Sequence, residues 1–268
     1  MSLLPSAPDV AEAAIAAVDW CGRPVDCGHC DAGGAAGLRC ERGRACVHDR
    51  YARRIDRYFN WNPQTADRWL THPYFEVRAI AVRHASVFRL PEMMADPDET
   101  VRLSVAMRLP QRQLRKLMND PHREVRIRVA GRLDPDALTK MCDDDDYYVR
   151  LQVARRLPVA LLARMAADPD PQVRRTVALR LDPAALGRMA QDGEVGVRRI
   201  VAARALPPLQ QALAADPAWE VRREVALHAG RALAAALSAD PEPEVVAAAE
   251  QRLAALDAGI GAEAGGHD

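Results

Sequence analysis

Five of the six cysteines lie in one short N-terminal stretch, at Cys21, Cys27, Cys30, Cys40 and Cys46. Cysteines gathered in this way are typical metal ligands, and the turn from Cys27 to Cys30, with glycine and histidine between them, can place two thiolates on one metal. The stretch contains many glycines and few large apolar residues. Because it has little core of its own, it depends on a ligand to fold. We therefore predict a metal centre here.

The residues alone leave the identity of the metal open. Zinc needs four ligands, which the cysteines supply together with His29 or His48. A [4Fe–4S] cluster needs four thiolates and would leave one of the five cysteines spare. Because the spacing does not match the common ferredoxin run, zinc is slightly preferred from the residues alone.

The sixth cysteine, Cys142, lies far from the others in the sequence. Its position in the repeat described below carries small or flexible apolar residues in other copies: Met94, Met118, Ala166 and Ala190. We interpret it as an apolar filler and not as a nucleophile. The acidic run that follows, 143–146, lacks the glycine and the distal glutamate of an EF-hand loop, so we interpret it as a solvated turn.

Most of the remaining chain repeats every 24 residues. The pair Val-Arg occurs seven times at this interval and an eighth copy has two valines, so the repeat is marked by Val77, Val101, Val125, Val149, Val173, Val197, Val221 and Val245. An aspartate stands five residues before each valine from Val101 onward, and proline follows it in five of the seven cases. Such a strict period indicates a solenoid in which each unit buries its apolar face against its neighbours.

Each repeat is predicted to hold two helical segments. Around Val149 the apolar residues fall four, five and eight positions further on, which is one face of an α-helix. The preceding aspartate and proline are expected to cap and begin this helix, and the run 96–99 has the spacing of a capping box. A shorter segment follows with apolar residues three apart, as at Leu138 and Met141, which suits one turn of α or 3₁₀ helix. No β-sheet is expected.

The Val-Arg-x-x-Val-Ala-x-Arg-Leu unit and its Asp-Pro partner resemble the leucine-rich repeat variant family. The resemblance covers residues 66–253. It implies an all-α fold, a right-handed superhelical solenoid of about eight 24-residue repeats, each an α-helix paired with a short 3₁₀-type helix. We accordingly expect a cysteine-rich iron–sulfur domain and N-terminal cap over residues 1–65, the solenoid over 66–253 and a flexible tail over 254–268.

Some members of that family begin with a small cysteine-rich domain that holds a [4Fe–4S] cluster. The run from Cys46 to Asp56 resembles the end of that domain. The resemblance therefore implies an iron–sulfur cluster in place of zinc. It makes four cysteines the first choice of ligands and a fifth the competitor for one place: Cys27, Cys30, Cys40 and Cys46, with Cys21 competing.

Two columns of arginine run through the repeats, one directly after the valines and one six residues later. They can form a phosphate-binding face, or they can pair with the aspartates and with backbone carbonyls, for which the forked guanidinium is suited. The formal net charge of zero favours pairing, since nucleic-acid binding normally needs an excess of positive charge. If such pairs are exposed, each contributes only ~0–1 kcal/mol.

Aromatic residues are concentrated between the cysteines and the first repeats. Seven of the twelve lie between residues 49 and 75. They can shield the metal centre from solvent and tune its potential, or they can cover the exposed end of the first repeat, as terminal repeats require. We favour the cap, and the two roles are compatible.

The sequence contains no apolar run near the ~20 residues that span a bilayer and no pattern of a signal peptide. We therefore expect no membrane association and a cytoplasmic location, where cysteines stay reduced or bind metal. No catalytic constellation is found either, neither a Gly-x-Ser-x-Gly elbow nor a phosphate-binding loop. We expect that the protein is not an enzyme.

The expected function is a non-enzymatic interaction scaffold that carries an N-terminal [4Fe–4S] cluster and binds a protein partner in a redox-dependent way. The alternatives are an accessory electron-transfer protein and a zinc-containing binding module. A nucleic-acid partner ranks last because an acidic column matches the arginine columns. The partner-binding residues and the identity of the partner are not readable from the sequence.

Overall fold

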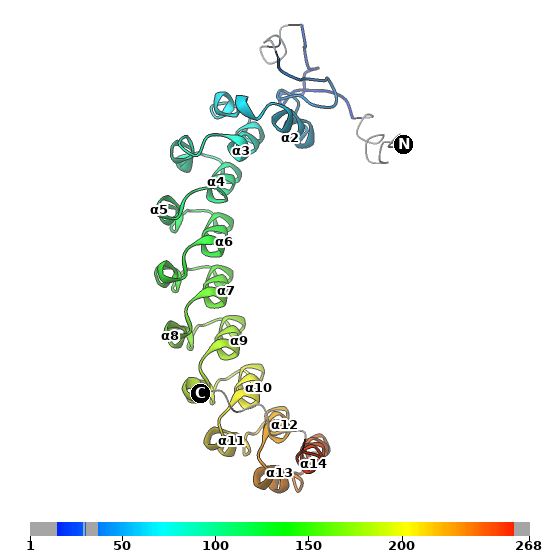
Figure 1. Ribbon diagram of the computed structural model, residues 1–268, viewed down its shortest axis with the longest axis vertical. Coiled ribbons are helices and arrows are strands. Elements are labelled where there is room, and N and C mark those ends of the chain that lie inside the picture. The colour runs from blue at the N-terminus through cyan, green and yellow to red at the C-terminus, as the bar shows by residue number, and fades with distance from the viewer. Residues whose placement is uncertain (1–14, 29, 31–36, 260–268) are drawn as a thin grey trace. The chain divides into compact units, whose positions relative to one another are not determined.

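The computed structural model describes residues 15–28, 30 and 37–259. Over these residues the chain forms helices and three isolated β-bridges, without a β-strand (Figure 1). It divides into two compact units, the first ending at Asp134 and the second beginning at Pro135. The expected all-α repeat fold is confirmed, and the right-handed twist of the solenoid stays a prediction.

The first unit holds the cysteine-rich segment and the first repeats. Its α-helices and 3₁₀ helices (η) are, in order, α2 (Ala52–Trp61), η1 (Pro63–Trp69), α3 (Phe75–His84), η2 (Leu90–Ala95), α4 (Glu99–Ala106), α5 (Gln111–Leu114), η3 (Arg115–Leu117) and α6 (Arg123–Arg132). Helix α2 contacts α3, and α3 contacts α4. The cysteine-rich segment is therefore joined to the repeats through α2.

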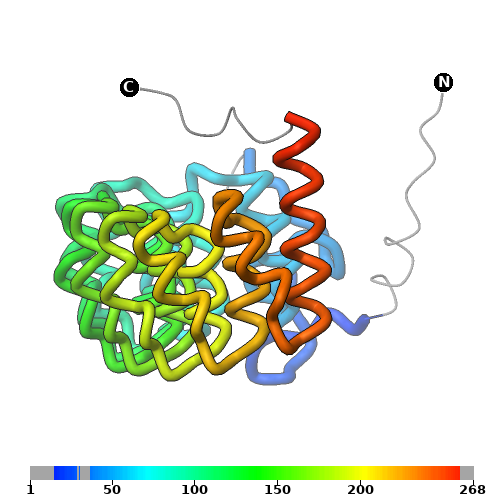
Figure 2. The backbone as a smooth tube through the Cα atoms, turned by 90° about the horizontal axis from the view of Figure 1, so that it is seen from below, coloured from blue at the N-terminus to red at the C-terminus, as the bar shows by residue number. Residues whose placement is uncertain are grey.

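The second unit continues the same alternation. Its helices are η4 (Pro135–Met141), α7 (Tyr147–Arg156), α8 (Val159–Leu162), η5 (Ala163–Met165), α9 (Pro171–Arg180), η6 (Pro183–Met189), α10 (Val195–Arg204), α11 (Pro207–Leu213), α12 (Trp219–His228), α13 (Arg231–Leu237) and α14 (Pro243–Asp257). Helices α7, α9, α10, α12 and α14 contact one another in chain order, and the yellow-to-red part of Figure 2 shows the later ones side by side. Residues 260–268 of the expected tail lie outside the described residues.

The shorter segment of each repeat varies along the chain. It is a 3₁₀ helix in η1, η2, η4 and η6, as predicted. In two repeats, α5–η3 and α8–η5, one α-helical turn precedes the 3₁₀ turn. In α11 and α13 it is an α-helix of seven residues. The predicted 3₁₀-type partner is therefore confirmed for the earlier repeats and replaced by an α-helix in the last two.

The repeated valines form the core. All eight, from Val77 to Val245, are 0% exposed. A second column four residues later, from Val105 to Val225, is equally buried. Each such side chain stabilises the fold by ~1.5–3 kcal/mol when fully buried. Because neighbouring helices supply the other side of this core, a single repeat cannot bury it alone.

The repeated aspartates do not cap the helices, which corrects the sequence-based expectation. In α4, α7 and α9 the N-cap is an aspartate two residues further on, Asp98, Asp146 or Asp170, whose carboxylate accepts a hydrogen bond from the helix backbone. Asp96 instead accepts from the backbone N–H of Asp98 at 2.9 Å. The proline after Asp96 therefore lies in the turn before the helix, and the run 96–99 is not a capping box.

The carboxylates of the repeated aspartates are not available for capping because they pair with the first arginine column. In six cases an arginine binds both carboxylate oxygens of the aspartate 18 residues further on, at 2.7–3.0 Å: Arg78–Asp96, Arg102–Asp120, Arg150–Asp168, Arg174–Asp192, Arg198–Asp216 and Arg222–Asp240. The aspartate side chains are 2–7% exposed and the arginine side chains 10–17%. These pairs are largely buried, so the value for exposed pairs understates what is lost when one partner is removed.

The second arginine column binds the main chain of the preceding repeat. Arg108 donates to the carbonyl oxygens of Val82 and Ala85 at 2.5 and 2.6 Å, and Arg180 donates to that of Ala154 at 2.6 Å. These carbonyls lie at the C-terminal ends of helices, where no partner is available within the helix. The interpretation of the arginine columns as internal pairing is confirmed at these positions.

Candidate metal centre

A tight turn shapes the start of the described cysteine-rich segment. The carboxylate of Asp19 accepts hydrogen bonds from the backbone N–H groups of Cys21 and Arg23 at 2.9 and 2.8 Å. Gly22 lies between them with φ of 84°, a conformation that glycine adopts without steric cost. Gly43 serves the turn before Cys46 in the same way, with φ of 78°. The glycines thus allow the sharp reversals between the cysteines.

The loop of Cys46 is held against α2 by a buried arginine. The backbone N–H of Cys46 donates to the carbonyl oxygen of Arg54 at 3.1 Å. The Arg54 guanidinium binds the carboxylate of Asp49 at 2.9 Å, and both side chains are 0% exposed. The same guanidinium donates to the carbonyl oxygens of Ile15 and Ala16 at 2.6 and 3.3 Å. Arg54 therefore connects α2 to the loop after Cys46 and to the residues before Cys21.

The loop of Cys40 is held at the other end of α2 by an asparagine. The side-chain oxygen of Asn62 accepts from the backbone N–H of Arg39 at 2.8 Å, and its amide nitrogen donates to the carbonyl oxygen of Arg39 at 2.7 Å. That nitrogen also donates to the carbonyl oxygen of Tyr58 at 2.9 Å. The Arg39 guanidinium lies over the Trp61 ring, 4.7 Å from its centroid. The residue before Cys40 is thus fixed to the last turn of α2.

The five predicted ligands differ in exposure. All are free thiols: Cys21 and Cys27 are exposed, Cys30 and Cys40 are half-buried, and Cys46 is buried. Cys30 and His48 line one cavity of about 400 Å³. His29, the other histidine considered as a zinc ligand, lies outside the described residues.

Four of the five thiols act on one another. A hydrogen bond from Cys46 lowers the pKa of Cys40, against burial and the negative charges of Cys30 and Cys27, which raise it. The same contact with Cys40, together with burial, raises the pKa of Cys46, while backbone hydrogen bonds from the following loop lower it. Cys27, Cys30 and Cys46 therefore all lie within electrostatic reach of Cys40.

Cys21 has a different environment. A hydrogen bond from Arg23 to Asp19 and the charge of Asp19 raise the pKa of Arg23, and the charge of Cys21 raises it further. The turn built by Asp19 thus places Cys21 beside Arg23. The choice of four ligands among the five cysteines stays a prediction, and this placement agrees with Cys21 as the spare thiol.

Aromatic side chains pack beside the loops that carry Cys40 and Cys46. The ring centroids of His48 and Trp69 are 5.3 Å apart, and those of Tyr58 and Trp69 are 6.4 Å apart, both edge to face. Burial raises the pKa of Tyr58, and the charge of Cys40 raises it further; the polar groups of Thr65 and Trp69 approach the hydroxyl without completing a hydrogen bond and lower the pKa. The Tyr58 ring therefore lies close to the thiol of Cys40.

The same aromatic segment also covers the first repeat. Phe59, next to Tyr58, is 0% exposed and stacks on His84 of α3 with ring centroids 6.0 Å apart. Ile55 of α2 is equally buried. The predicted cap over the first repeat is therefore confirmed, and the role of the aromatic residues as a shield of the metal centre stays a prediction.

Cysteine thiolates are the donors that an iron–sulfur cluster requires. Among the described residues, no group of three or more His, Cys, Asp or Glu side chains could hold a metal ion as they stand. A [4Fe–4S] cluster is bound by one thiolate at each of its irons, so its ligands surround a larger body and do not meet at one point. Two features fit such a body. Four thiols influence one another, and the loops of two of them, Cys40 and Cys46, are held by α2. Two buried donors, the Tyr58 hydroxyl and the Trp69 indole nitrogen, have no partner among the described residues.

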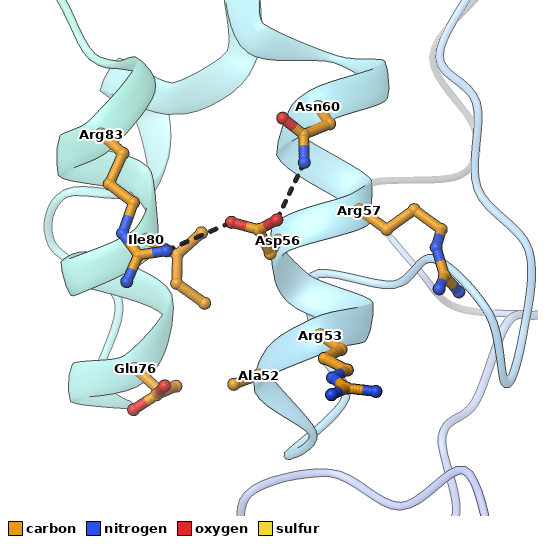
Figure 3. Close-up of a pocket in the computed structure, with 8 residues that line it drawn as sticks. All are labelled: Ala52, Arg53, Asp56, Arg57, Asn60, Glu76, Ile80 and Arg83. Carbon is orange, nitrogen blue, oxygen red and sulfur yellow. Dashed lines mark hydrogen bonds and ion pairs between the residues drawn. The ribbon is translucent and has the colours of Figure 1, made fainter. Parts of the chain in front are cut away.

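A separate pocket of about 390 Å³ lies between α2 and α3 (Figure 3). Asp56 accepts from the Asn60 amide at 2.9 Å and pairs with Arg83 at 3.3 Å, as the dashed lines show. Two further arginines, Arg53 and Arg57, stand on α2 at its rim. The sequence singled out none of these residues because charged positions on a helix surface are ordinarily solvated. Charges of both signs line the pocket, and Asp56 is already paired with Arg83, so the pocket defines no particular ligand.

Comparison with known proteins separates the two parts of the chain. Residues 17–68 match the family described as LRV protein FeS4 cluster. Residues 75–98, 147–170 and 171–194 match the family described as leucine rich repeat variant. A solved structure, "a leucine-rich repeat variant with a novel repetitive protein structural motif", is 44% identical with a TM-score of 0.79, over 85% of this chain and 99% of that one. The chain belongs to the leucine-rich repeat variant family.

A second relative of this leucine-rich repeat variant comes from Rhodobacter capsulatus. It is an uncharacterized 27.7 kDa protein from the nifB 3′ region, 46% identical over 99 residues. The match spans 35% of this chain and 38% of the length of that protein.

The family match of the N-terminal residues concerns the cofactor. The match over residues 17–68 implies an FeS4 cluster in the N-terminal domain and gives no support to zinc. Within the part of the chain that the structure describes, no helix has the length and apolar character needed to cross a membrane.

Proposed function

We propose that this leucine-rich repeat variant is a non-enzymatic interaction scaffold that carries a [4Fe–4S] cluster on Cys27, Cys30, Cys40 and Cys46. The observation that supports it most is the mutual influence of these four thiols, two of which, Cys40 and Cys46, lie on loops that α2 holds in place. The match of residues 17–68 to a family with an FeS4 cluster supports the same assignment. When bound, such a cluster supplies one-electron chemistry.

The chain prepares two of the four ligand positions before the cluster binds. Asn62 fixes the backbone immediately before Cys40, and Arg54 accepts from the backbone of Cys46 itself. Fixing ligand loops in advance reduces the ordering cost of binding. Asn62→Ala is therefore expected to lower cluster occupancy while Cys40 is still present, which iron and sulfide analysis measures.

Redox-dependent partner binding is the function that we assign to the cluster. Cys27 is exposed and Cys30 half-buried, so this pair of ligands lies where a protein partner can contact it. A one-electron change at the cluster alters the charge of that surface, and charge complementarity influences how fast and how selectively a partner binds. We assign the remaining contact surface to the exposed side chains of the repeats. Their arginine and aspartate columns are engaged in internal pairs and do not serve this contact.

The test compares one protein in two states. Holoprotein purified without oxygen is used to isolate partners from its native extract, with Cys40→Ser protein as the cluster-free control. The affinity of each recovered partner is then measured for the oxidised and the reduced holoprotein. We expect the dissociation constants to differ by about fivefold or more, the lower range of allosteric coupling. Equal affinities for every partner would contradict the redox dependence.

An accessory electron-transfer protein is the second candidate, favoured by the exposure of Cys27. A ligand at the surface shortens the path from the cluster to a docked partner. Electron transfer requires the cluster to cycle reversibly, so voltammetry of the holoprotein separates the two candidates. Reversible reduction at a potential that the isolated partner can use would support the carrier. Breakdown of the cluster on reduction would exclude it.

A further inference from the structure

Two aromatic side chains of the N-terminal domain carry buried hydrogen-bond donors without a partner among the described residues. Tyr58 is 0% exposed and Trp69 is 5% exposed. Neither the Tyr58 hydroxyl nor the Trp69 indole nitrogen makes a hydrogen bond among the described residues. Leaving a buried donor unsatisfied is costly, and native proteins leave few of them. The two donors belong to rings whose centroids are 6.4 Å apart. Two unsatisfied donors in neighbouring rings call for a shared explanation.

Both residues pack beside loops that carry cysteines. Asn62 links the carbonyl oxygen of Tyr58 to Arg39, the residue before Cys40. The ring of Trp69 packs on His48, two residues after Cys46. Tyr58 and Trp69 therefore pack beside the loops of Cys40 and Cys46, and the charge of the Cys40 thiol acts on Tyr58.

Thr65, Trp69 and Arg68 are the polar side chains of the repeats' cap that influence the pKa of Tyr58, and of these only the Thr65 hydroxyl can accept a hydrogen bond. That hydroxyl donates to the carbonyl oxygen of Asn62 at 2.8 Å. Tyr58 and Thr65 nevertheless form no hydrogen bond in the described structure. Sulfur atoms of the metal centre are the acceptors that chemistry would add at this place.

We propose that the Tyr58 hydroxyl and the Trp69 indole N–H donate hydrogen bonds to sulfur atoms of the iron–sulfur cluster, either cysteinyl or bridging sulfide. The inference rests on the proposed [4Fe–4S] function and goes beyond it, because it assigns two residues that are not ligands a role in setting the potential. Hydrogen bonds to the sulfurs are among the factors that set cluster potentials.

The direction of the effect follows from charge. A donor stabilises the more negative, reduced cluster more than the oxidised one, so each donor raises the reduction potential. Removing one is expected to shift the reduction equilibrium by about tenfold toward the oxidised form, which is 59 mV for a one-electron couple.

Tyr58→Phe in the full-length holoprotein tests the proposal, because it removes one oxygen atom and keeps the ring. Tyr74→Phe is the matched control, since the Tyr74 hydroxyl already donates to the carbonyl oxygen of Arg50 at 3.2 Å. Reduction potentials are measured by spectroelectrochemical titration. Pulsed electron–nuclear double resonance on the reduced cluster after exchange into D₂O detects deuterons bonded to its sulfurs.

We expect Tyr58→Phe to keep its iron and sulfide, to have a lower potential and to lose one coupled deuteron, while Tyr74→Phe matches the wild type. An unchanged potential and unchanged couplings in cluster-loaded Tyr58→Phe would overturn the inference and leave the proposed cluster intact. A wild-type protein without iron and sulfide would overturn both.

A second variant covers the case in which Tyr58→Phe does not retain the cluster. Trp69→Phe removes the other donor and is read by the same two measurements. The wild-type spectrum is decisive in either case, because the absence of any strongly coupled exchangeable deuteron would overturn the inference without any variant.

Discussion

Asp168 and Arg150 form one of the largely buried ion pairs of the second unit, and this pair can be used to measure how much such pairs stabilise the repeats. Asp168 accepts from two nitrogens of Arg150 at 2.8 and 3.0 Å and from the backbone N–H of Asp170 at 2.9 Å. The remaining terminal nitrogen of Arg150 donates to the carbonyl oxygen of Asp144 at 2.8 Å. The two side chains are 4% and 10% exposed, respectively. Asp168→Ala therefore removes three hydrogen bonds and leaves a largely buried guanidinium without its counter-charge.

The size of the effect follows from this burial. Removing one partner of a buried pair costs ~3–5 kcal/mol, against ~0–1 kcal/mol for an exposed pair. Asp145→Ala is the control, because Asp145 is exposed in the turn before α7, and surface substitutions usually change stability by at most about 0.5 kcal/mol. Replacing both partners, Arg150→Met with Asp168→Leu, should recover most of the loss, since apolar replacement of a buried pair is often close to neutral.

Urea unfolding followed by circular dichroism measures the change in free energy. Hydrogen exchange of the backbone amides in α7 and α9 then locates it, because repeat proteins open locally as well as globally. We expect Asp168→Ala to lower the unfolding midpoint and to speed exchange in both helices. If its midpoint and exchange rates match those of Asp145→Ala, the ion pairs do not hold the repeats together in the way described.

Three further outcomes follow from the same packing. Val149→Asp places a charge at a position that is 0% exposed and should cost several kcal/mol, about 3 or more; an unchanged melting temperature would show that the buried face is misplaced. Hydrogen bonding from Arg222 holds the pKa of Asp240 below its ordinary value near 3.8, so this pair stabilises the fold above about pH 4 and its contribution is lost as pH falls through the lowered pKa. Between about pH 6 and about pH 3 the urea midpoint should fall less for Asp240→Asn than for the wild type, and equal falls would contradict the assignment. Asp49→Asn removes the carboxylate charge that pairs with the fully buried Arg54 and should cost ~3–5 kcal/mol in the first unit, measured by thermal unfolding against the exposed control Glu41→Gln.

The repeat and its buried face were predictable because a single period controls both. The valine that recurs every 24 residues is buried in each copy, so the spacing that reveals the repeat also marks the core. The role of the aspartates was not predictable from local rules. Asp96 and Asp98 both stand where a cap is expected, and Asp98 takes the cap because Asp96 is bound by Arg78, 18 residues earlier in the chain. A contact at that distance is not visible in a capping pattern.

In the cysteine-rich domain, too, one part of the site was predictable from the sequence and another was not. Spacing brought five cysteines into one candidate site, but the turn at Gly22, built by Asp19, is what turns Cys21 toward Arg23. The two unsatisfied donors were also out of reach of sequence reasoning. Tyr58 and Trp69 were recognised as part of an aromatic segment, and only the surrounding structure shows that their polar atoms lack partners.

The central claim is that four particular cysteines hold a [4Fe–4S] cluster, and metal analysis of cysteine variants tests it most directly. Each cysteine is replaced singly by serine, the proteins are purified without oxygen, and iron, sulfide and zinc are measured on the same samples. The wild type, Cys21→Ser and Cys142→Ser should each hold about four irons and four sulfides per chain, and serine at Cys27, Cys30, Cys40 or Cys46 should abolish the intact cluster. One zinc per wild-type chain, or a cluster lost in Cys21→Ser and kept in one of those four variants, would contradict the assignment.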